Sequence, residues 1–349
     1  MNAPDLDAMP RTAAPVHPTH KFKLLLQREF WEHKGGFLWS PLIAGGISLL
    51  LTGMMIVFGL VAARRAAANG DFQLDGINVN GLDITQLTSK MSAADMAQFA
   101  QGIDLTLFLS SAWPFIVLAF VVFFYCLGAL YDERKDRSVL FWKSLPVSDA
   151  QTVLSKVASA VVVAPVLALI ASFVTMLGFM AMISIVVLFH GGNPVTLLWG
   201  PASPLKIMAS SIAWIPVYAL WALPTVGWLL LCSAWSRSKP FLWAIMVPLF
   251  AGIFVSWFDL MELFKLDSSW FWSNVVSRLL LGTVPGMDLL SRDDFGQGGS
   301  HNMQDILDSV SPASQLASLA TPAIWIGAVA GALMIYGAIQ LRRRRELAD

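Results

Sequence analysis

Six long apolar stretches constrain the fold of this chain more than any other feature of its sequence. A helix needs about 20 apolar residues to cross roughly 30 Å of hydrocarbon. The stretches lie at about 37–62, 106–130, 153–188, 206–234, 241–258 and 321–341. Charged residues make up only 13% of the chain, against about 25% in soluble domains. The sequence therefore predicts an all-α polytopic membrane protein with six transmembrane helices.

The basic residues indicate how these helices are oriented. With both termini in the cytoplasm, the inner segments hold sixteen Lys and Arg residues and the outer segments hold seven. Four of the sixteen form the run RRRR at 342–345, directly after the last stretch. Because Lys and Arg concentrate in cytoplasmic loops, we expect a multi-pass protein of the cell membrane with both termini cytoplasmic. We expect that membrane to be a bacterial inner membrane.

The segments outside the spans divide the chain further. We expect a disordered cytoplasmic tail at 1–19, because four prolines and few large apolar residues occur there. A basic cytoplasmic tail is expected at 342–349. The six-helix domain at 37–341 has two outer loops, 63–105 with a short helix around 93–101, and 259–320.

The second outer loop contains SSWFWSNVVSRLLLGTVPGMDLL, which is too interrupted to span and too apolar for water. We expect a re-entrant or interfacial helix at 269–290, packed against the last span.

The sequence HKFKLLLQREFWEHKGG at 20–36 precedes the first span. Four of its apolar residues form one stripe at helical spacing, which Leu24 and Trp31 interrupt, with charges on much of the remaining surface. Such a helix lies in a membrane interface, and the pair Gly35-Gly36 is expected to end it before the chain enters the bilayer. The residues of this interfacial elbow helix are Phe22, Leu25, Leu26 and Phe30. A cytoplasmic extension of the first span is the alternative interpretation.

The loop at 131–152, between spans two and three, holds the densest charge cluster of the chain, DERKDR at 132–137. A helix from Arg137 to Leu145 would place Val139, Phe141, Trp142 and Leu145 on one face. Pro146 would end that helix. Ser148 and Gln151 would then form a capping box at the start of the next helix. A plain interfacial anchor, with Trp142 at the headgroups, is the alternative interpretation.

Several functions are disfavoured by what the sequence lacks. No G-x-x-x-x-G-K-[ST] phosphate loop, H-E-x-x-H zinc pair or G-x-S-x-G nucleophile motif occurs. The net charge is zero, so no nucleic-acid partner is expected. The spans contain almost no ionisable residue away from their ends, which argues against proton- or sodium-coupled transport. Transport by this chain would therefore need energy from another protein.

The segment LYDERKDRSVLFWKSLPVSDAQTVLSK resembles the coupling segment of the integral-membrane permease subunits of type-two ABC exporters. In that family an acidic–basic pair precedes a small residue, a leucine-rich turn and a closing L-P-V-S. Ser138 stands where many members have glycine. The rest of the chain is similar in the order of its parts. The fitting residues are Glu133, Arg134, Leu140, Leu145, Pro146, Val147 and Ser148.

The resemblance implies a transporter of two ABC ATPase chains and two permease chains, as a homodimer or a heterodimer. ATP and Mg would be bound by the ATPase, so this chain is expected to hold no cofactor and to catalyse no reaction. Reversing the charge of Glu133 or Arg134 is expected to weaken ATPase docking without affecting membrane insertion. The expected ATPase-coupling interface consists of Glu133, Arg134, Arg137, Leu140, Phe141, Trp142, Leu145 and Pro146.

Two other functions stay open from the sequence. One is a membrane-embedded enzyme, which would require polar catalytic groups in or at the mouth of the spans. The other is a membrane assembly factor that transports nothing. A phosphate-loop ATPase encoded in a neighbouring reading frame would favour the transporter over both.

Overall fold

The computed structural model describes residues 18–68, 73–74, 77–78, 92–138, 146–261, 267–287 and 308–345. Within these residues, six helices are long and apolar enough to cross a membrane. Each of them coincides with one of the predicted stretches, so the six-helix membrane fold is confirmed. They are Gly35–Ala62, Ala94–Lys135, Asp149–Phe189, Pro204–Trp235, Pro240–Leu260 and Pro322–Arg344.

The secondary-structure elements subdivide these spans. A short antiparallel pair, β1 (Gln73–Leu74) and β2 (Ile77–Asn78), follows the first span. The elements of the first half are α1 (Pro18–Glu32), η1 (Gly35–Trp39), α2 (Ser40–Ala68), α4 (Ala93–Ser111), α5 (Trp113–Gly128), α6 (Tyr131–Lys135), α8 (Asp149–Ala158), η2 (Ser159–Val163) and α9 (Ala164–Phe189). Those of the second half are η3 (Val195–Trp199), α10 (Pro204–Trp235), α11 (Pro240–Leu260), α12 (Ser268–Phe271), η4 (Trp272–Val276), α13 (Ser277–Leu281), α17 (Pro312–Ala317), η5 (Ser318–Ala320) and α18 (Pro322–Arg345).

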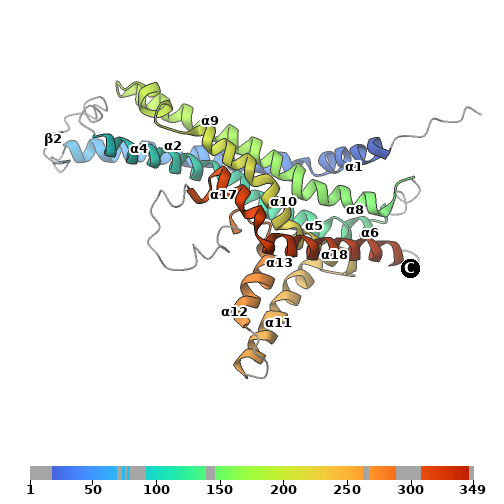
Figure 1. Ribbon diagram of the computed structural model, residues 1–349. Coiled ribbons are helices and arrows are strands. Elements are labelled where there is room, and N and C mark those ends of the chain that lie inside the picture. Colours follow the sequence, from blue (N-terminus) through green and yellow to red (C-terminus); the bar gives the residue numbers. More distant parts are fainter. Residues whose placement is uncertain are drawn as a thin grey trace, which may run out of the picture.

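Most helices form one elongated bundle, from which α11 and α12 project to one side (Figure 1). Within the bundle, α10 packs against α18, and α2 packs against α9 and α5. The main core contains Leu118 and Val122 of α5, Val153 of α8 and Leu229 of α10, none of which is exposed. The core therefore joins the second, third and fourth spans, while α2 and α11 lie at the periphery.

Glycine lets α10 and α18 approach to backbone contact. A Cβ on Gly331 would lie 2.5 Å from the carbonyl carbon of Leu223 and 2.7 Å from the nitrogen of Pro224. A Cβ on Gly227 would lie 2.6 Å from the carbonyl oxygen of Gly331. Small residues permit such close helix packing in membranes, where van der Waals contact contributes much of the association.

The junction before the first span differs from the prediction. Gly35-Gly36 was expected to end the elbow helix, whereas α1 ends at Glu32 and η1 begins at Gly35. The π-helical turn of η1 leads directly into α2, and the amide of Phe37 donates to the carbonyl of His33 at 3.0 Å. Neither glycine adopts a positive φ, so the pair is part of a helical turn and no αL cap forms.

The outer loop predicted at 63–105 is also shorter than expected. Helix α2 continues to Ala68, and α4 begins at Ala93 with a capping box between Ser92 and Asp95. The short helix expected around 93–101 runs on into the second span, because the apolar residues after Gly102 continue the helix. One glycine inside a helix costs only about 1 kcal/mol.

The interrupted apolar segment forms a helical run at 268–281, composed of α12, η4 and α13. It is shorter than the about 20 residues that a span requires. It was expected to pack against the last span, but it lies along α11, and only its end reaches α18. There Arg278 Nη1 donates to the carbonyl of Ala323 at 2.6 Å. The predicted residues 288–290 lie outside the described part of the chain.

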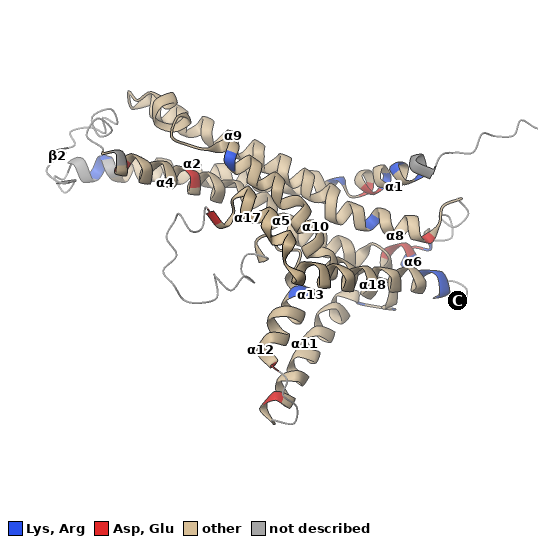
Figure 2. Cartoon of the chain, in the orientation of Figure 1, with Lys and Arg blue, Asp and Glu red and all other residues tan. Residues whose placement is uncertain are grey.

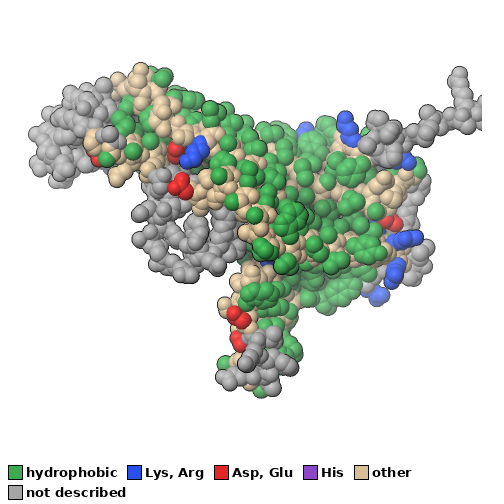
Figure 3. Space-filling view, in the orientation of Figure 1, with side chains coloured by type: hydrophobic (Ala, Val, Ile, Leu, Met, Phe, Trp, Pro, Cys, Tyr) green, Lys and Arg blue, Asp and Glu red, His purple; other side chains and the backbone are tan. Residues whose placement is uncertain are grey.

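Among the residues that the structure describes, charge is concentrated at one end of the bundle. Apolar side chains cover most of the bundle on the face drawn in Figure 3. Lys, Arg, Asp and Glu gather where α1, α6, α8 and the last turns of α18 meet (Figure 2). The helices before and after the predicted coupling loop, α6 and α8, both lie at this end, which we call the charged end.

Candidate functional site

Four side chains from four helices form a buried ionic cluster at the charged end. Lys156 Nζ of α8 lies 3.0 Å from Glu29 Oε1 of α1 and 3.0 Å from Glu133 Oε1 of α6. Arg342 Nη1 of α18 lies 2.8 Å from Glu133 Oε2. Glu29 is fully buried, and Lys156 is only 2% exposed. The ionic cluster, defined as Glu29, Glu133, Lys156 and Arg342, therefore joins elements that are far apart in the sequence.

Further polar groups satisfy the edges of this cluster. Tyr125 OH donates to Glu29 Oε2 at 2.7 Å, and Arg342 Nε donates to Asp149 Oδ1 at 3.2 Å. Arg28 Nη2 lies 3.4 Å from Glu133 Oε1 and 3.2 Å from Glu32 Oε2. Burying charges is costly unless they are paired and hydrogen-bonded. Each of the four buried charges meets this condition, so the cluster holds the helices together as long as it stays complete.

The position of Glu29 follows from the periodicity of α1. Leu25 precedes Glu29 by one helical turn, so both lie on the face that packs against α8. Leu25 is buried, and the other members of the predicted stripe (Phe22, Leu26 and Phe30) are half-buried. Leu24 and Trp31 are 63% and 60% exposed. The stripe therefore packs on the chain itself, and Leu24 and Trp31 are the large apolar residues exposed on the part of α1 whose side chains are described, 21–32.

A second junction holds α6 against the end of α10. Arg134 Nη2 donates to the carbonyls of Ser233 at 2.6 Å and Ser236 at 2.9 Å. Ser233 Oγ accepts from the amides of Leu130 and Tyr131 and donates to the carbonyl of Leu127 at 2.7 Å. These bonds satisfy backbone groups at a helix end and fix the direction in which α6 leaves the second span.

These contacts correct the expected roles of Glu133 and Arg134. Both were expected to offer charge to a docking partner, but Glu133 is buried in the ionic cluster and Arg134 is bound to the end of α10. Reversing the charge of Glu133 would leave a buried charge unpaired, so the effect would not be confined to docking. Their charges are used inside the chain because the helices bring cations to Glu133 and backbone carbonyls to Arg134.

The other expected coupling residues fall into two groups. Arg137 is exposed and has a φ of 55°, so the helix predicted from Arg137 to Leu145 cannot begin at that residue. Pro146 is exposed, and its carbonyl accepts from Lys21 Nζ of α1 at 3.0 Å. Leu140, Phe141, Trp142 and Leu145 lie outside the described residues.

Two further predictions concern the start of α8 and the residues after the last span. The capping box of Ser148 and Gln151 is confirmed, and α8 begins at Asp149. The basic tail predicted from 342 is wrong in its first residues, because α18 continues to Arg345 and Arg342 is buried. A basic residue directly after an apolar stretch can reach a carboxylate on a neighbouring helix, as Arg342 reaches Glu133.

Two charged residues at apolar positions of the sequence are signals for the ionic cluster. Glu29 stands within the apolar stripe of α1, and Lys156 stands at the start of the apolar run VLSKVASAVVVAP. Charges at such positions are costly without a partner. Their occurrence predicts pairing, but the sequence alone does not give the partner, since Glu29 and Lys156 are 127 positions apart.

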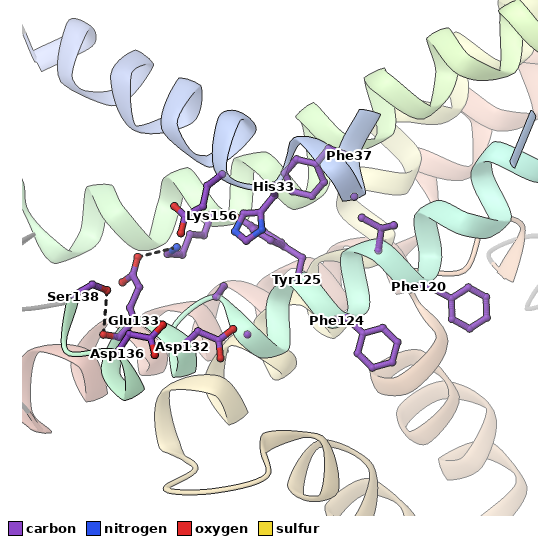
Figure 4. A pocket seen from close by; sticks show the side chains of 15 residues that line it. His33, Phe37, Phe120, Phe124, Tyr125, Asp132, Glu133, Asp136, Ser138 and Lys156 are labelled. Carbon is purple, nitrogen blue, oxygen red and sulfur yellow. Dashed lines mark hydrogen bonds and ion pairs between the residues drawn. The ribbon is translucent and has the colours of Figure 1, made fainter. Parts of the chain in front are cut away.

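A groove of about 680 Å³ opens beside the ionic cluster, between η1 and α5. Figure 4 shows the carboxylates of Asp132 and Asp136 at one end of it and the rings of Phe120 and Phe124 at the other. His33 lies between them, with its ring edge-on to Tyr125 at 4.7 Å between centroids. Burial lowers the pKa of His33, while Glu29 and Glu32 act in the opposite direction. This residue is therefore neutral at pH 7.

The chemistry available at the charged end is electrostatic. Among the described residues, no three His, Cys, Asp or Glu side chains are grouped as metal ligands. The ionic cluster has no nucleophile paired with a base, and each of its charges has an opposite charge within 3.0 Å. Such an arrangement can fix helices relative to one another and can pass on a displacement. No protein-family model, curated protein or solved structure matches this chain.

Proposed function

We propose that this chain is the transmembrane permease subunit of a type-two ABC exporter. It would form the translocation pathway with a second permease chain and be driven by two separate ATPase chains. The six apolar helices and the lack of a phosphate-loop motif support this division of labour. In this proposal the protein lies in a bacterial inner membrane, both termini are cytoplasmic, and ATP and Mg are bound by the ATPase.

The observation that carries the proposal is the position of the ionic cluster around the loop at 139–145. Glu133 precedes this loop and Lys156 follows it, and the two side chains are in direct contact. Glu29 of α1 and Arg342 of α18 complete the same cluster. A force applied to the loop would therefore reach α1, α6, α8 and α18 together.

The exposed side of α1 supports a position at the inner membrane surface. Leu24 and Trp31 are exposed there beside the basic residues Lys23 and Lys34. Lys34 Nζ lies 5.2 Å from the centroid of the Trp31 ring. Tryptophan and lysine are both favoured at the level of lipid headgroups. In this proposal α1 is held from one side by α8 and rests on the membrane with the other.

The proposal is tested by co-expressing the tagged chain with the ATPase of a neighbouring reading frame and measuring how much ATPase is retained on purification. The variant is Trp142→Ala, and the matched control is Trp270→Ala, which removes an exposed tryptophan from α12. A buried aromatic anchor contributes about 2 kcal/mol or more to an interface. That corresponds to about thirtyfold weaker binding.

We expect Trp142→Ala to lose the ATPase while its abundance in the membrane stays normal, and Trp270→Ala to retain the ATPase. Arg137→Glu should weaken ATPase retention more at low salt than at high salt. Arg137 is exposed, and dissolved salt screens the interactions of exposed charges. Full ATPase retention by both loop variants would contradict the coupling role of this segment.

A further inference from the structure

Gly36 and Gly128 are among the residues that line the groove beside the ionic cluster. A Cβ on Gly128 would lie 2.5 Å from Asp132 Oδ2, and a Cβ on Gly36 would lie 3.2 Å from Val121 Cγ1. The volume of about 680 Å³ falls within the roughly 300–1,000 Å³ typical of ligand sites. The groove is thus large enough for a lipid headgroup and the first part of an acyl chain.

One wall of this groove is apolar and open. Phe120 and Phe124 of α5 are 63% and 58% exposed, and both line the groove. They belong to the helical span Ala94–Lys135. In a membrane these rings would lie at the depth of acyl chains, while Asp132 and Asp136 would lie beyond them at the headgroups.

The polar end of the groove carries unmatched negative charge. Glu133 and Lys156 also line it, but their charges are paired within the ionic cluster. Glu32 is paired with Arg28. Asp132 and Asp136 are exposed, and no side chain in the described part of the protein pairs with either. The groove therefore has an apolar wall at one end and two carboxylates without an ion-pair partner among the described residues at the other end.

We propose that this groove binds a phospholipid with a primary amine headgroup, from the leaflet that adjoins the charged end. Its acyl chain would lie against Phe120 and Phe124, and its ammonium group would donate to Asp132 and Asp136. A primary ammonium has three N–H donors, whereas a trimethylated amine has none and an anionic headgroup is repelled. This proposal depends on a membrane location and makes no use of an ATPase.

The test uses the purified full chain, incubated with equal amounts of phosphatidylethanolamine, phosphatidylcholine and phosphatidylglycerol. The lipids that remain bound are measured by native mass spectrometry. A partly exposed ion pair changes binding by about fivefold, so the amine lipid should be retained about fivefold over each of the others. Replacing Asp132 and Asp136 together by Asn should remove this preference. Asp308→Asn, which alters an exposed carboxylate that does not line the groove, should retain it.

A second series needs no protein variant and so does not depend on how a variant folds. The headgroup nitrogen is methylated once, twice and three times, and retention by the unaltered chain should fall at each step as N–H donors are lost. Equal retention across this series would overturn the proposal. So would an undiminished preference for the amine lipid in the Asp132→Asn, Asp136→Asn variant. Because no ATPase is present, either result leaves the proposed transport function untouched.

Discussion

Lys156 is the residue on which the charged end depends most. Its ammonium group lies 3.0 Å from both Glu29 and Glu133, and it is almost fully buried. Removing one partner of a buried ion pair is costly, because the remaining charge loses its compensation. Two carboxylates would lose a cation at once if Lys156 were replaced by an apolar residue.

We therefore expect Lys156→Met to lower the free energy of unfolding by about 3–5 kcal/mol. Lys135→Met is the matched control, since Lys135 is exposed on α6, and its effect should stay within about 0.5 kcal/mol. Denaturant titration in detergent micelles, followed by tryptophan fluorescence, measures both. Equal stability of the two variants would show that the ionic cluster contributes nothing to the folded state.

His33 makes the charged end sensitive to acid. Burial lowers its pKa below 6.5, with Glu29 and Glu32 opposing the shift and Lys156 and Arg28 adding to it. The imidazole of His33 therefore takes up a proton more readily in the unfolded chain than in the folded chain. The stability contribution of the neutral ring is complete above about pH 6.5 and is lost as the pH falls through the lower, folded-state pKa.

We expect the thermal midpoint of the protein to fall between pH 7 and pH 5, and to fall less in His33→Gln. Comparing the two melting curves across this pH range measures the difference. An identical pH dependence would show that His33 does not account for the acid sensitivity.

At the scale of helices, hydropathy and capping predicted most of what the structure contains. The six spans follow from the length of the apolar stretches, and the start of α8 follows from Ser148 and Gln151. The ionic cluster could not be predicted in the same way, because Glu133 and Arg342 are 209 positions apart. The packing of 268–281 along α11 likewise depends on tertiary contacts such as the bond from Trp272 Nε1 to Ser256 Oγ.

The contact between α10 and α18 gives a prediction at this scale. Gly331→Ala would place a methyl group 2.5 Å from the backbone of Leu223, so the two helices would have to separate. We expect a loss of about 1–3 kcal/mol, the usual cost of overpacking. Gly59→Ala in α2 is the control, because nothing lies within 4 Å of its added Cβ, and it should be neutral or slightly stabilising. A destabilisation no larger than that of Gly59→Ala would contradict the close packing.

At the scale of the whole molecule, the proposed function assigns different roles to the charged end and the far end of the bundle. The charged end joins four helices through the ionic cluster and adjoins the loop at 139–145. At the far end, α9 and α4 reach beyond the main core, and Asp104 accepts from the amide of Ser203 at 2.7 Å. In our account the charged end faces the cytoplasm, where an ATPase can reach it, and the far end faces outward.

Site-directed labelling in intact cells tests this orientation most directly. Cys126 and Cys232 are buried, so an added cysteine supplies nearly all of the signal. Lys135→Cys marks the exposed surface of α6, and Asp308→Cys marks the outer segment before α18. We expect an impermeant thiol reagent to modify Asp308→Cys in intact cells and Lys135→Cys only after the membrane is permeabilised. Modification of Lys135→Cys in intact cells would place the charged end outside and contradict the proposed function.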